Sequence, residues 1–465
     1  MSDGVAIVGM ACRFAGSADV DAFWRNVLSC ERFFDDPPEA DASRWRDPDA
    51  SLFERVPTLR AGYLGDLWYI DRSSHPARRD VRGIDPAQLL AVDLAARALQ
   101  DAGSADRAPC RERASVYVGH SPGLNAGNVG WMQLGLGLDQ TIDLVRQCLP
   151  QATPQALASL RQALRAALPE FDLRTAASLL PDALTARIAT RLDFHGAHHT
   201  LDAGASSALL ALRAGCDDLL AGRADMALAG AVQGAISPQS LMPYARLGLL
   251  SRQPAPLPFG QDAAGTLFGE GGALFVLKRV EEAMDEGDRI YAVLRGFGVA
   301  CEGRGFTLRG GPDEKSHLRA LERAYAAAGS RPDAGFIEAH GCGIPAWDRA
   351  EFRALDSLFG PSKGGWPEVA LGALKGQFGH TGVAAGAAGV VKAALGLHHQ
   401  ILPPSPDNGD PPVSLRMAES TFYIATEARP WVHHSLRPRR AGVSTIGFNG
   451  LHAHVVLEEA VPSLG

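Results

Sequence analysis

Short apolar segments alternate with amphipathic helices along this chain, and this alternation restricts the possible folds more than any other feature. The segments at 4–14, 114–121 and 224–234 are almost wholly apolar. Residues 85–103 repeat apolar side chains every three or four positions, which predicts a helix. Strands that are apolar on both faces and separated by helices are typical of a parallel sheet covered on both sides. We therefore expect an α/β protein.

The alternation runs through the 465 residues twice. A segment rich in Pro and Gly at 252–265 indicates a crossing between two halves, after which the alternation resumes. We predict an N-terminal half at 1–255 and a C-terminal half at 256–465, with a duplicated architecture but no literal sequence repeat. Residues 122–180 are mostly helical in pattern and predict an insertion on one face rather than a separate domain.

Composition and charge exclude several classes of function. The net charge of -7 disfavours nucleic acid as a partner. The apolar runs are too short or too interrupted to span a membrane. The seven cysteines have no regular spacing and no CxxC pair, which disfavours a zinc site and indicates reduced thiols. We expect a cytoplasmic protein that needs no metal.

The stretch LDAGASSALLAL, residues 201–212, predicts a strand end, a tight corner of small residues and the start of a helix. Such corners present nucleophiles in many enzymes, because a helix N-terminus favours negative charge. The residue at the tip, however, is Ala205, whose methyl group cannot act as a nucleophile. Ser206 follows it, but helix geometry turns the next side chain by about a hundred degrees. We expect the serines here to cap the helix.

Three further segments combine glycine with histidine at predicted strand ends: 338–351, 374–386 and 447–454. A lone histidine after a strand is more often structural than catalytic. Two histidines flanked by glycine, His340 and His380, with Lys375 five positions before the second, favour a site instead.

Taken together, these motifs resemble the β-ketoacyl synthase (ketosynthase) family of fatty-acid and polyketide assembly. The resemblance covers nearly the whole chain, and several ordered motifs make it specific. The helical segment before LTARIATRLDFHGAHHTLDAG is similar to ketosynthases of iterative, enediyne-type synthases. The segments that carry the family resemblance are VAIVGMACRFAGSADVDAFWRNV, PFGQDAAGTLFGEGGALFVLKRVEEA, EAHGCGIP, LKGQFGHTGVAAGAAG and GFNGLHAHVVLEE.

The resemblance implies a thiolase-like, five-layered fold of two pseudo-symmetric halves, usually a homodimer. It also implies decarboxylative Claisen condensation of malonyl and acyl thioesters, delivered on the phosphopantetheine of an acyl carrier protein without a further cofactor. In the family, two histidines hydrogen-bond the malonyl thioester while an acylated cysteine is attacked. The histidines correspond to His340 and His380, the motif's lysine to Lys375, the gating phenylalanine to Phe448 and the cysteine to Ala205.

The chemistry is consistent with these residue types. Decarboxylation builds negative charge on the thioester oxygen, which preorganised donors in a dry pocket stabilise. Neutral histidines are the better donors at physiological pH, and a nearby lysine disfavours a second positive charge on either ring.

Several positions depart from the family pattern. Cys342 replaces a usual threonine, and Asn449 and His452 replace a usual glycine and asparagine near the gate. We expect Cys342 to be a small buried thiol rather than a substitute nucleophile, and Cys216 to lie in the core. The residues predicted to contact substrate are Phe448, Cys342, Ser206 and Asn449.

Ala205 leaves several interpretations open. The chain is a cysteine-to-alanine variant of a condensing enzyme, a natural decarboxylase or acyl-chain handler, or a silent partner that resembles a chain-length factor. A non-catalytic module that presents a carrier-bound chain is a further alternative. His340, Lys375 and His380 are all retained, which argues against the last two. Carbon dioxide release from malonyl carrier protein separates a decarboxylase from a binding module.

Overall fold

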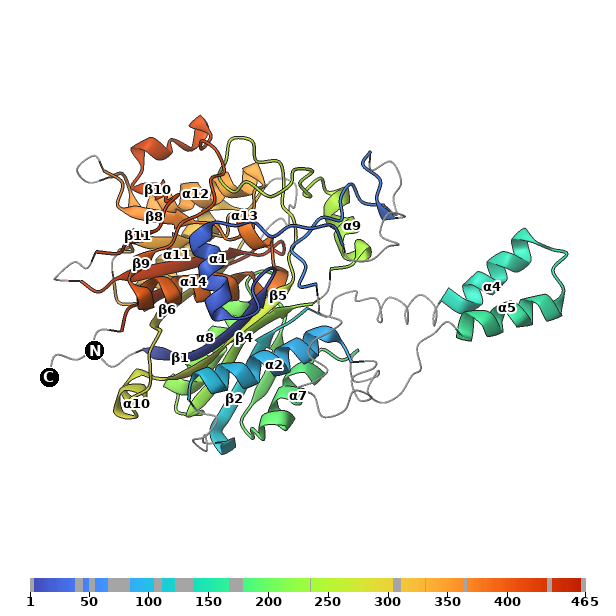
Figure 1. Cartoon of the computed structure of the whole chain (residues 1–465), viewed down its shortest axis with the longest axis horizontal. Coiled ribbons are helices and arrows are strands. Elements are labelled where there is room, and N and C mark those ends of the chain that lie inside the picture. Colours follow the sequence, from blue (N-terminus) through green and yellow to red (C-terminus); the bar gives the residue numbers. More distant parts are fainter. Residues whose placement is uncertain are drawn as a thin grey trace.

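A mixed sheet of eleven strands lies at the centre of the molecule (Figure 1). The computed structural model describes residues 4–37, 45–49, 55–65, 84–103, 111–121, 137–166, 179–234, 236–303, 311–330, 332–362, 366–432 and 437–460. The strands of the large sheet are β1 (Val5–Phe14), β2 (Ala114–Gly119), β3 (His198–Leu201), β4 (Met226–Gln233), β5 (Gly271–Arg279), β6 (Ala292–Cys301), β7 (Phe336–Glu338), β8 (Val369–Gly372), β10 (Phe422–Ile424), β12 (Arg440–Ile446) and β13 (Leu451–Glu458), and a separate pair is formed by β9 (Ile401–Leu402) and β11 (Arg429–Pro430).

Helices cover the sheet and connect its strands (Figure 1). Their bounds are α1 (Val20–Ser29), α2 (Pro86–Asp101), α4 (Gly137–Cys148), α5 (Pro154–Ala166), α7 (Ala183–Leu192), α8 (Ser207–Leu220), α9 (Pro238–Arg246), α10 (Val280–Asp285), α11 (Glu314–Ala327), α12 (Pro345–Phe359), α13 (Lys375–Phe378) and α14 (Ala385–His399). The strands and helices expected from the apolar segments at 4–14, 85–103, 114–121 and 224–234 are present as β1, α2, β2 and β4.

The order of the strands shows a duplication. In the first set the neighbours run β1-β5-β4-β2-β3, and in the second they run β6-β13-β12-β7-β8. Each set begins with two antiparallel pairings and continues with two parallel ones. β1 also pairs with β6 and so joins the sets. The expected architecture of two pseudo-symmetric halves is confirmed.

The strand order also bears on where one half ends. The first set ends with β5 at Arg279, and the second begins with β6 at Ala292. We therefore propose a division between these strands, later than the 255/256 boundary expected from the sequence. The Pro- and Gly-rich segment at 252–265 leads into the last strand of the first set. The sequence prediction placed the boundary in this segment because a long loop within one half can have the same Pro- and Gly-rich composition as a linker between two halves.

The helices and the two strand sets form five layers. α2 and α7 contact strands of the first set on one side, while α8 and α14 contact each other and strands of both sets. α11 packs against β6 and β13 and against α12 on the far side of the second set. The central pair, α8 and α14, is therefore enclosed on both sides by strands.

The burial of alternate residues explains why the strands are apolar throughout. In β1, Val5 and Ile7 belong to the central core, whereas Ala6 and Val8 belong to the core beneath α2. Successive strand residues point to opposite faces, so a strand with both faces covered needs apolar side chains at every position. α14 follows the same rule, since its residues from Gly386 to Leu397 are buried on all sides.

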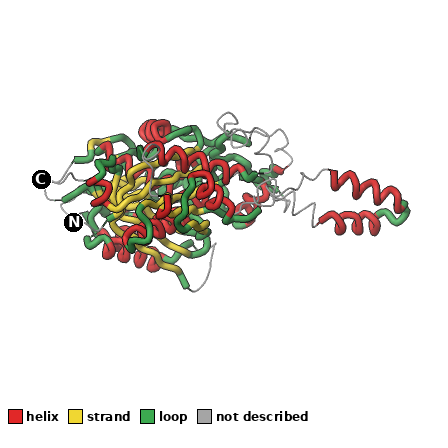
Figure 2. The backbone as a smooth tube through the Cα atoms, turned by 90° about the horizontal axis from the view of Figure 1, so that it is seen from below, coloured by secondary structure: helices red, strands yellow, loops and turns green. Residues whose placement is uncertain are grey.

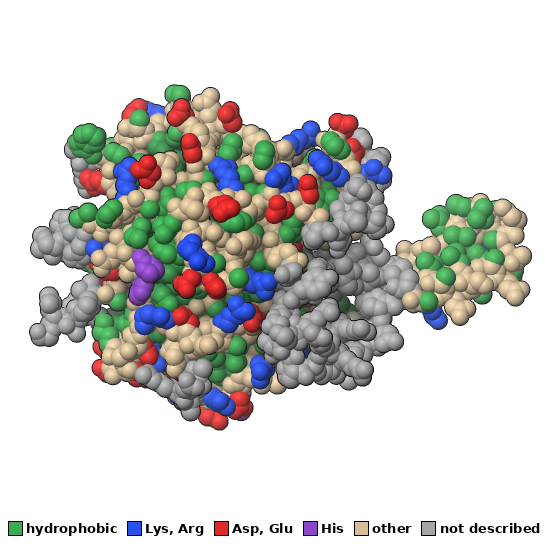
Figure 3. Space-filling model, in the orientation of Figure 1, with side chains coloured by type: hydrophobic (Ala, Val, Ile, Leu, Met, Phe, Trp, Pro, Cys, Tyr) green, Lys and Arg blue, Asp and Glu red, His purple; other side chains and the backbone are tan. Residues whose placement is uncertain are grey.

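The predicted insertion contains a helical hairpin, α4 and α5, that projects from the body (Figures 1 and 2). Residues 122–136 and 167–178 of the insertion lie outside the described residues. On the face drawn in Figure 3, basic and acidic side chains are interspersed. Among the described residues, no helix combines the length and apolar character needed to cross a membrane.

Candidate active site

The corner at residues 201–207 connects β3 to α8 as the sequence predicts. Gly204 has a φ of 58°, a left-handed conformation that favours glycine. Ser207 stabilises the corner, because its Oγ accepts from the Ala203 N–H at 2.8 Å and donates to the Gly204 carbonyl at 2.7 Å. Ala205 is buried at the tip, just before the first turn of α8. The structure thus places the Ala205 methyl group at the tip of the corner, the position that the resemblance assigns to a cysteine.

Ser206 does not cap the helix as we expected. It occupies the N-cap position of α8, but its side chain makes no capping hydrogen bond. Its Oγ instead donates to the Leu451 carbonyl at 3.2 Å and accepts from the Thr445 hydroxyl at 3.0 Å. These partners lie on β13 and β12, so Ser206 joins the corner to the second strand set. Its hydroxyl is thereby occupied in holding the two halves together.

The turn between β12 and β13 lies directly against the nucleophile corner. A methyl group built on Gly204 would approach Gly447 and Asn449 at 3.9 Å. Asn449 is exposed, and its side-chain oxygen accepts from the Leu451 N–H at 3.3 Å. Phe448, between Gly447 and Asn449 in the sequence, stacks its ring on that of His380, with the two ring centroids 5.7 Å apart. The turn that carries Phe448 therefore contacts both the corner and His380.

His380 has a defined tautomer. Its Nδ1 accepts from the Gly382 N–H at 3.1 Å, and a backbone N–H can only donate. The proton of the neutral ring consequently resides on Nε2. That nitrogen is buried and has no hydrogen-bond partner among the described residues. It is a donor available to a substrate.

His340 lies beside His380 and is equally buried. The two imidazole centroids are 5.2 Å apart, and the rings meet edge to face. Neither ring nitrogen of His340 has a partner among the described residues. A buried polar group without a partner calls for a functional explanation such as a ligand or a water. The two rings offer several such nitrogens within one small space.

Electrostatics keep both rings neutral. Burial lowers the pKa of His340 well below its usual value, and Lys375 and then His380 lower it further. Burial and then Lys375 do the same to the pKa of His380. Lys375, whose Nζ donates to the His340 carbonyl, acts in the direction predicted from the sequence. Burial nevertheless contributes more than the lysine.

Two buried carboxylates hold the loop that carries His340. Glu351 accepts from the backbone N–H groups of His340 at 2.6 Å and Gly341 at 2.8 Å. Asp348 accepts from the Cys342 N–H at 2.9 Å. Burial raises the pKa of Glu351 to about 7 and that of Asp348 to about 6. The loop geometry thus depends on two acids in the first turns of α12.

The cysteines near the site are poor nucleophiles. Cys342 is fully buried, and burial followed by the charge of Asp348 raises its pKa well above the usual value. Cys216 lies in the central core, as expected, and burial raises its pKa too. A raised pKa removes the reactive thiolate. Neither thiol is suited to replace the nucleophile missing at Ala205.

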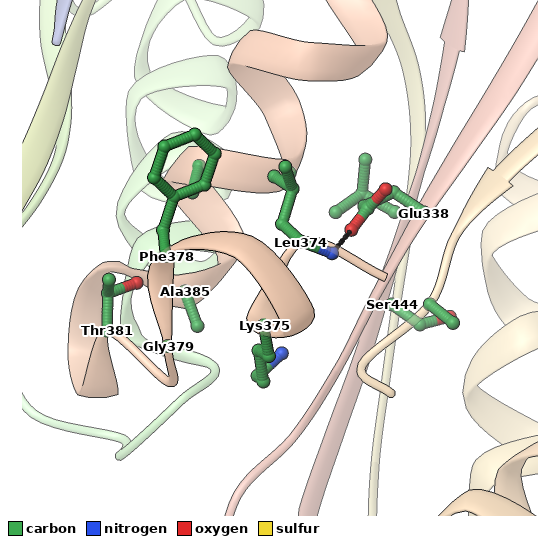
Figure 4. A pocket seen from close by; sticks show the side chains of 12 residues that line it. Glu338, Leu374, Lys375, Phe378, Gly379, Thr381, Ala385 and Ser444 are labelled. Atoms are coloured by element: carbon green, nitrogen blue, oxygen red, sulfur yellow. Dashed lines mark hydrogen bonds between the residues drawn. The ribbon is translucent and has the colours of Figure 1, made fainter. Parts of the chain in front are cut away.

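A small cavity is lined in part by Lys375, Phe378 and Glu338, beside the short helix α13 (Figure 4). Glu338 borders it, accepts from the Leu374 N–H at 2.6 Å and pairs with the buried Lys392 at 2.9 Å. The cavity measures about 10 Å³, room for roughly one water. It is too small for an acyl group, so the substrate must approach the histidines from another side. Within the described residues, no group of three or more His, Cys, Asp or Glu is arranged to hold a metal.

Four aromatic side chains enclose the histidine pair, and we call them the aromatic cluster: Tyr244, Phe268, Trp347 and Phe448. The ring centroids form a closed circuit through both histidines. The successive distances are His340–Trp347 6.1 Å, Trp347–Phe448 4.8 Å, Phe448–Tyr244 5.1 Å, Tyr244–Phe268 4.5 Å, Phe268–His380 5.5 Å and His380–His340 5.2 Å.

Sequence reasoning identified only Phe448 of this cluster. Tyr244 and Phe268 come from the segments around α9 and before β5, and nothing local distinguishes them from core aromatics. Trp347, Asp348 and Glu351 do lie within the quoted 338–351 motif. Two acids near the start of a helix, directly after a glycine-rich loop, could have indicated carboxylates that bind the loop backbone.

Comparison with known proteins identifies the family. Residues 2–283 match the model of the beta-ketoacyl synthase N-terminal domain, and residues 291–408 match that of the C-terminal domain. The chain belongs to the β-ketoacyl synthase family. Polyketide synthase ThaG of Burkholderia thailandensis is 32% identical over 98% of this chain, which spans only 8% of that protein.

Solved ketosynthases share the fold. The ketosynthase from module 6 of the bacillaene synthase of Bacillus subtilis 168 aligns with a TM-score of 0.80 and 27% identity, covering 99% of this chain and 72% of that one. The PfaC keto synthase-chain length factor aligns with a TM-score of 0.83 and 27% identity, covering 99% and 48%. The expected thiolase-like ketosynthase fold is confirmed.

Proposed function

We propose that this ketosynthase domain binds malonyl thioesters on the phosphopantetheine of an acyl carrier protein and releases carbon dioxide from them without condensation. The observation that carries the proposal is the histidine pair. His380 presents an Nε2–H that has no partner among the described residues, and His340 lies against it with both nitrogens equally unoccupied. Two neutral donors in a buried space suit a developing enolate oxygen.

The proposed reaction has two steps. The histidines act in the first, a decarboxylation, and the second is a proton transfer. The bond from the α-carbon to the malonyl carboxylate breaks, and carbon dioxide leaves without the electron pair. The electron pair of the broken bond converts the thioester into an enolate, whose oxygen accepts hydrogen bonds from His340 and His380. Protonation of the α-carbon by water then gives an acetyl thioester. Neither histidine has to change its charge.

Ala205 accounts for the proposed absence of condensation. Condensation requires an acyl group held covalently near the enolate, and a methyl side chain forms no thioester. The two nearest alternatives are unsuitable, since Ser206 is engaged with β12 and β13 and Cys342 is buried with a raised pKa. This reasoning applies equally to a natural decarboxylase and to a cysteine-to-alanine variant of a condensing enzyme.

The aromatic cluster favours one other candidate function, a non-catalytic partner that resembles a chain-length factor. Phe448 is stacked on His380, and Trp347 packs on Phe448, so the histidines are covered in this structure. A cluster that never opens would leave the site without substrate. The resemblance to the PfaC keto synthase-chain length factor is compatible with this alternative.

Carbon dioxide release from malonyl carrier protein tests the proposed function. We expect release by the parent chain, and a loss of about 100-fold in His340→Ala and in His380→Ala, the usual effect of removing one donor from an oxyanion site. His195→Ala is the matched control, because this ring is half exposed and pairs only with Asp193 at 3.2 Å among the described residues. No release by a folded parent chain would favour the non-catalytic partner.

We also propose a homodimer in which β3 pairs with its counterpart in a second copy. β3 is the last strand of the sheet and is partly exposed. The carbonyls of Ala197 and Leu201 accept hydrogen bonds from the backbone of β2 and the residue that follows it. Because successive residues of a strand point their backbone groups to opposite sides, those of His198 and Thr200 point away from β2. An unpaired edge is a template for another strand. Thr200→Pro removes one outward N–H and should yield monomers in sedimentation velocity. A parent chain that sediments as a monomer would contradict the dimer.

A cytoplasmic location completes the proposal. The cysteines that the structure describes are all free thiols, which supports a reducing compartment. Phosphopantetheine arrives on the carrier protein as part of the substrate, and the proposed chemistry uses no other cofactor.

A further inference from the structure

Trp347 lies between Phe448, the predicted gate, and His340, one of the two histidines of the site. It is the third residue of α12 and is only 4% exposed. Its indole packs against Phe448 with centroids 4.8 Å apart and against His340 at 6.1 Å. Its neighbour Asp348 binds the backbone N–H groups of Phe259 and Cys342. These hydrogen bonds hold the backbone at Trp347 in place beside the histidine pair.

His380 is buried, and the Phe448 ring covers one face of its imidazole. The Phe448 ring is stacked on the imidazole at an interplanar angle of 20°. Phe448 is on a turn between two strands and is partly exposed, whereas Trp347 is on a helix and buried. Movement of Phe448 off the imidazole would free the volume of a benzyl group beside its ring partners Trp347, Tyr244 and His380. A malonyl unit is of similar size, and a long acyl chain is not.

The indole N–H provides an independent sign of a ligand. Nε1 of Trp347 is buried without a hydrogen-bond partner among the described residues. Indole N–H groups usually have a partner when buried. The acyl thioester that displaces Phe448 carries carbonyl and carboxylate oxygens, and either can accept this hydrogen bond.

We propose that Trp347 determines the acyl specificity of the site: its ring limits the acyl group to a malonyl-sized unit, and its N–H binds an oxygen of that unit. The inference rests on the proposed function, because it assumes that a malonyl thioester is the substrate. It concerns which acyl group binds, whereas the proposed function concerns what happens to the group after binding.

Two pantetheine amides, malonyl and octanoyl, test the size limit by calorimetry because an amide is not consumed. The parent chain should bind the malonyl amide and discriminate against the octanoyl amide. Trp347→Ala should have an octanoyl-to-malonyl affinity ratio about tenfold or more higher than that of Trp347→Phe, which lacks the same N–H but keeps a ring, as expected when roughly two further methylene groups become buried. Equal ratios in Trp347→Ala and Trp347→Phe, both with the parent's thermal unfolding midpoint, overturn the size limit.

Trp347→Phe tests the hydrogen bond, because it keeps a ring and removes the N–H. This variant should bind the malonyl amide about tenfold more weakly, the effect of one hydrogen bond, and should still reject the octanoyl amide. Trp431→Phe is the matched control, since Trp431 is also buried but packs on Phe336, in the central core. Equal affinity of Trp347→Phe and the parent overturns the hydrogen bond.

Carbon dioxide release by the parent separates the inference from the proposed function. If the Trp347 variants change specificity as expected but the parent releases no carbon dioxide, the proposed function fails and the inference stands. If the parent releases carbon dioxide, Trp347→Phe binds the malonyl amide as tightly as the parent does, and Trp347→Ala and Trp347→Phe have the same affinity ratio, the inference fails alone. Failure of both amides to bind to the parent and to Trp347→Ala overturns both.

Discussion

At the scale of single residues, burial shifts the pKa values of several groups at the site toward their neutral forms. His340 and His380 are held neutral mainly by burial and secondarily by Lys375. Burial also raises the pKa of Glu351 to about 7, while its carboxylate accepts two backbone N–H groups. Each group favours its neutral form because charge is poorly solvated there. Ala205, by contrast, has a methyl group at the position that the resemblance assigns to the family's cysteine.

Ala205→Cys should restore an acyl acceptor. The new thiol would lie at the N-terminus of α8, which lowers a thiol pKa. Its thiolate should attack an acyl thioester and expel the pantetheine thiolate, leaving an acyl group on the protein. Intact mass after incubation with acetyl-coenzyme A should rise by one acetyl group, mapped to position 205. Cys216 and Cys342 are the internal controls, because burial raises the pKa of both. Acylation of the parent at Cys342 or Ser206 would show that the nucleophile is elsewhere.

Glu351 should make the stability of the fold depend on pH. Its pKa rises from 4.5 in the unfolded chain to about 7 in the fold, so the folded state retains a proton that the unfolded state loses. Stability from this group is therefore lost as pH rises from 4.5 to 7, by about 3 kcal/mol at roughly 1.4 kcal/mol per pKa unit.

Denaturant unfolding of the parent and of Glu351→Gln measures this contribution. The difference in unfolding free energy between them should change across that pH interval, because glutamine does not titrate. A difference that stays constant with pH would contradict the raised pKa of Glu351.

At the scale of elements, close approach of helix and strand backbones builds the layers. α11 lies on β6 where Gly296 and Gly298 face it. A methyl group built on Gly298 would lie 1.8 Å from the Ala320 carbonyl oxygen, and one on Gly296 would lie 2.3 Å from that of Ala324. Neither carbonyl can retreat without moving the helix axis. The two glycines thereby set the distance between this helix and the sheet.

Gly298→Ala should therefore destabilise the fold. The added methyl group overlaps a helix backbone, and overpacking of this kind costs about 1–3 kcal/mol or more. Equilibrium unfolding in guanidinium would report it as a lower transition midpoint. Gly137→Ala in α4 is the control, because a methyl group there meets no atom of the described residues within 4 Å. Equal midpoints for Gly298→Ala and the parent would show that α11 moves away freely.

At the scale of the whole molecule, the two halves are joined through the corner and the central helices. Ser206 binds β12 and β13 from the first half, and α8 packs on α14 between the strand sets. The α4–α5 hairpin projects from this body in both views (Figures 1 and 2). Its own stabilising contacts include the ion pair between Arg161 and Asp139 at 2.5 Å.

Replacement of residues 137–166 by a short Gly-Ser linker should leave the body intact. Loop closure entropy changes slowly with loop length, and the layered core does not include the hairpin. The thermal unfolding midpoint of the shortened chain should match that of the parent, as followed by circular dichroism. Carbon dioxide release should also be retained if the hairpin takes no part in the site. A large loss of stability would show that the hairpin packs on the body in solution.

The sequence alone was sufficient to predict the class and the duplication of the fold, while the roles of the motif residues stay predictions. These features depend on local patterns: apolar strands, helical periodicity and glycine beside histidine. The resemblance to ketosynthases then gave the layered fold. The boundary between the halves was harder to place, because a Pro- and Gly-rich loop before β5 has the composition of a linker.

The tertiary structure decided the features that depend on distant residues. The Gly382 N–H selects the tautomer of His380, and burial by both halves sets the neutral state of its ring. Tyr244, Phe268, Trp347 and Phe448 meet around the histidines although they are far apart along the chain. Ser206 was expected to cap α8, but partners on β12 and β13 take its hydroxyl. Burial and contact are properties of the packed chain, so a linear pattern determines them only through the fold.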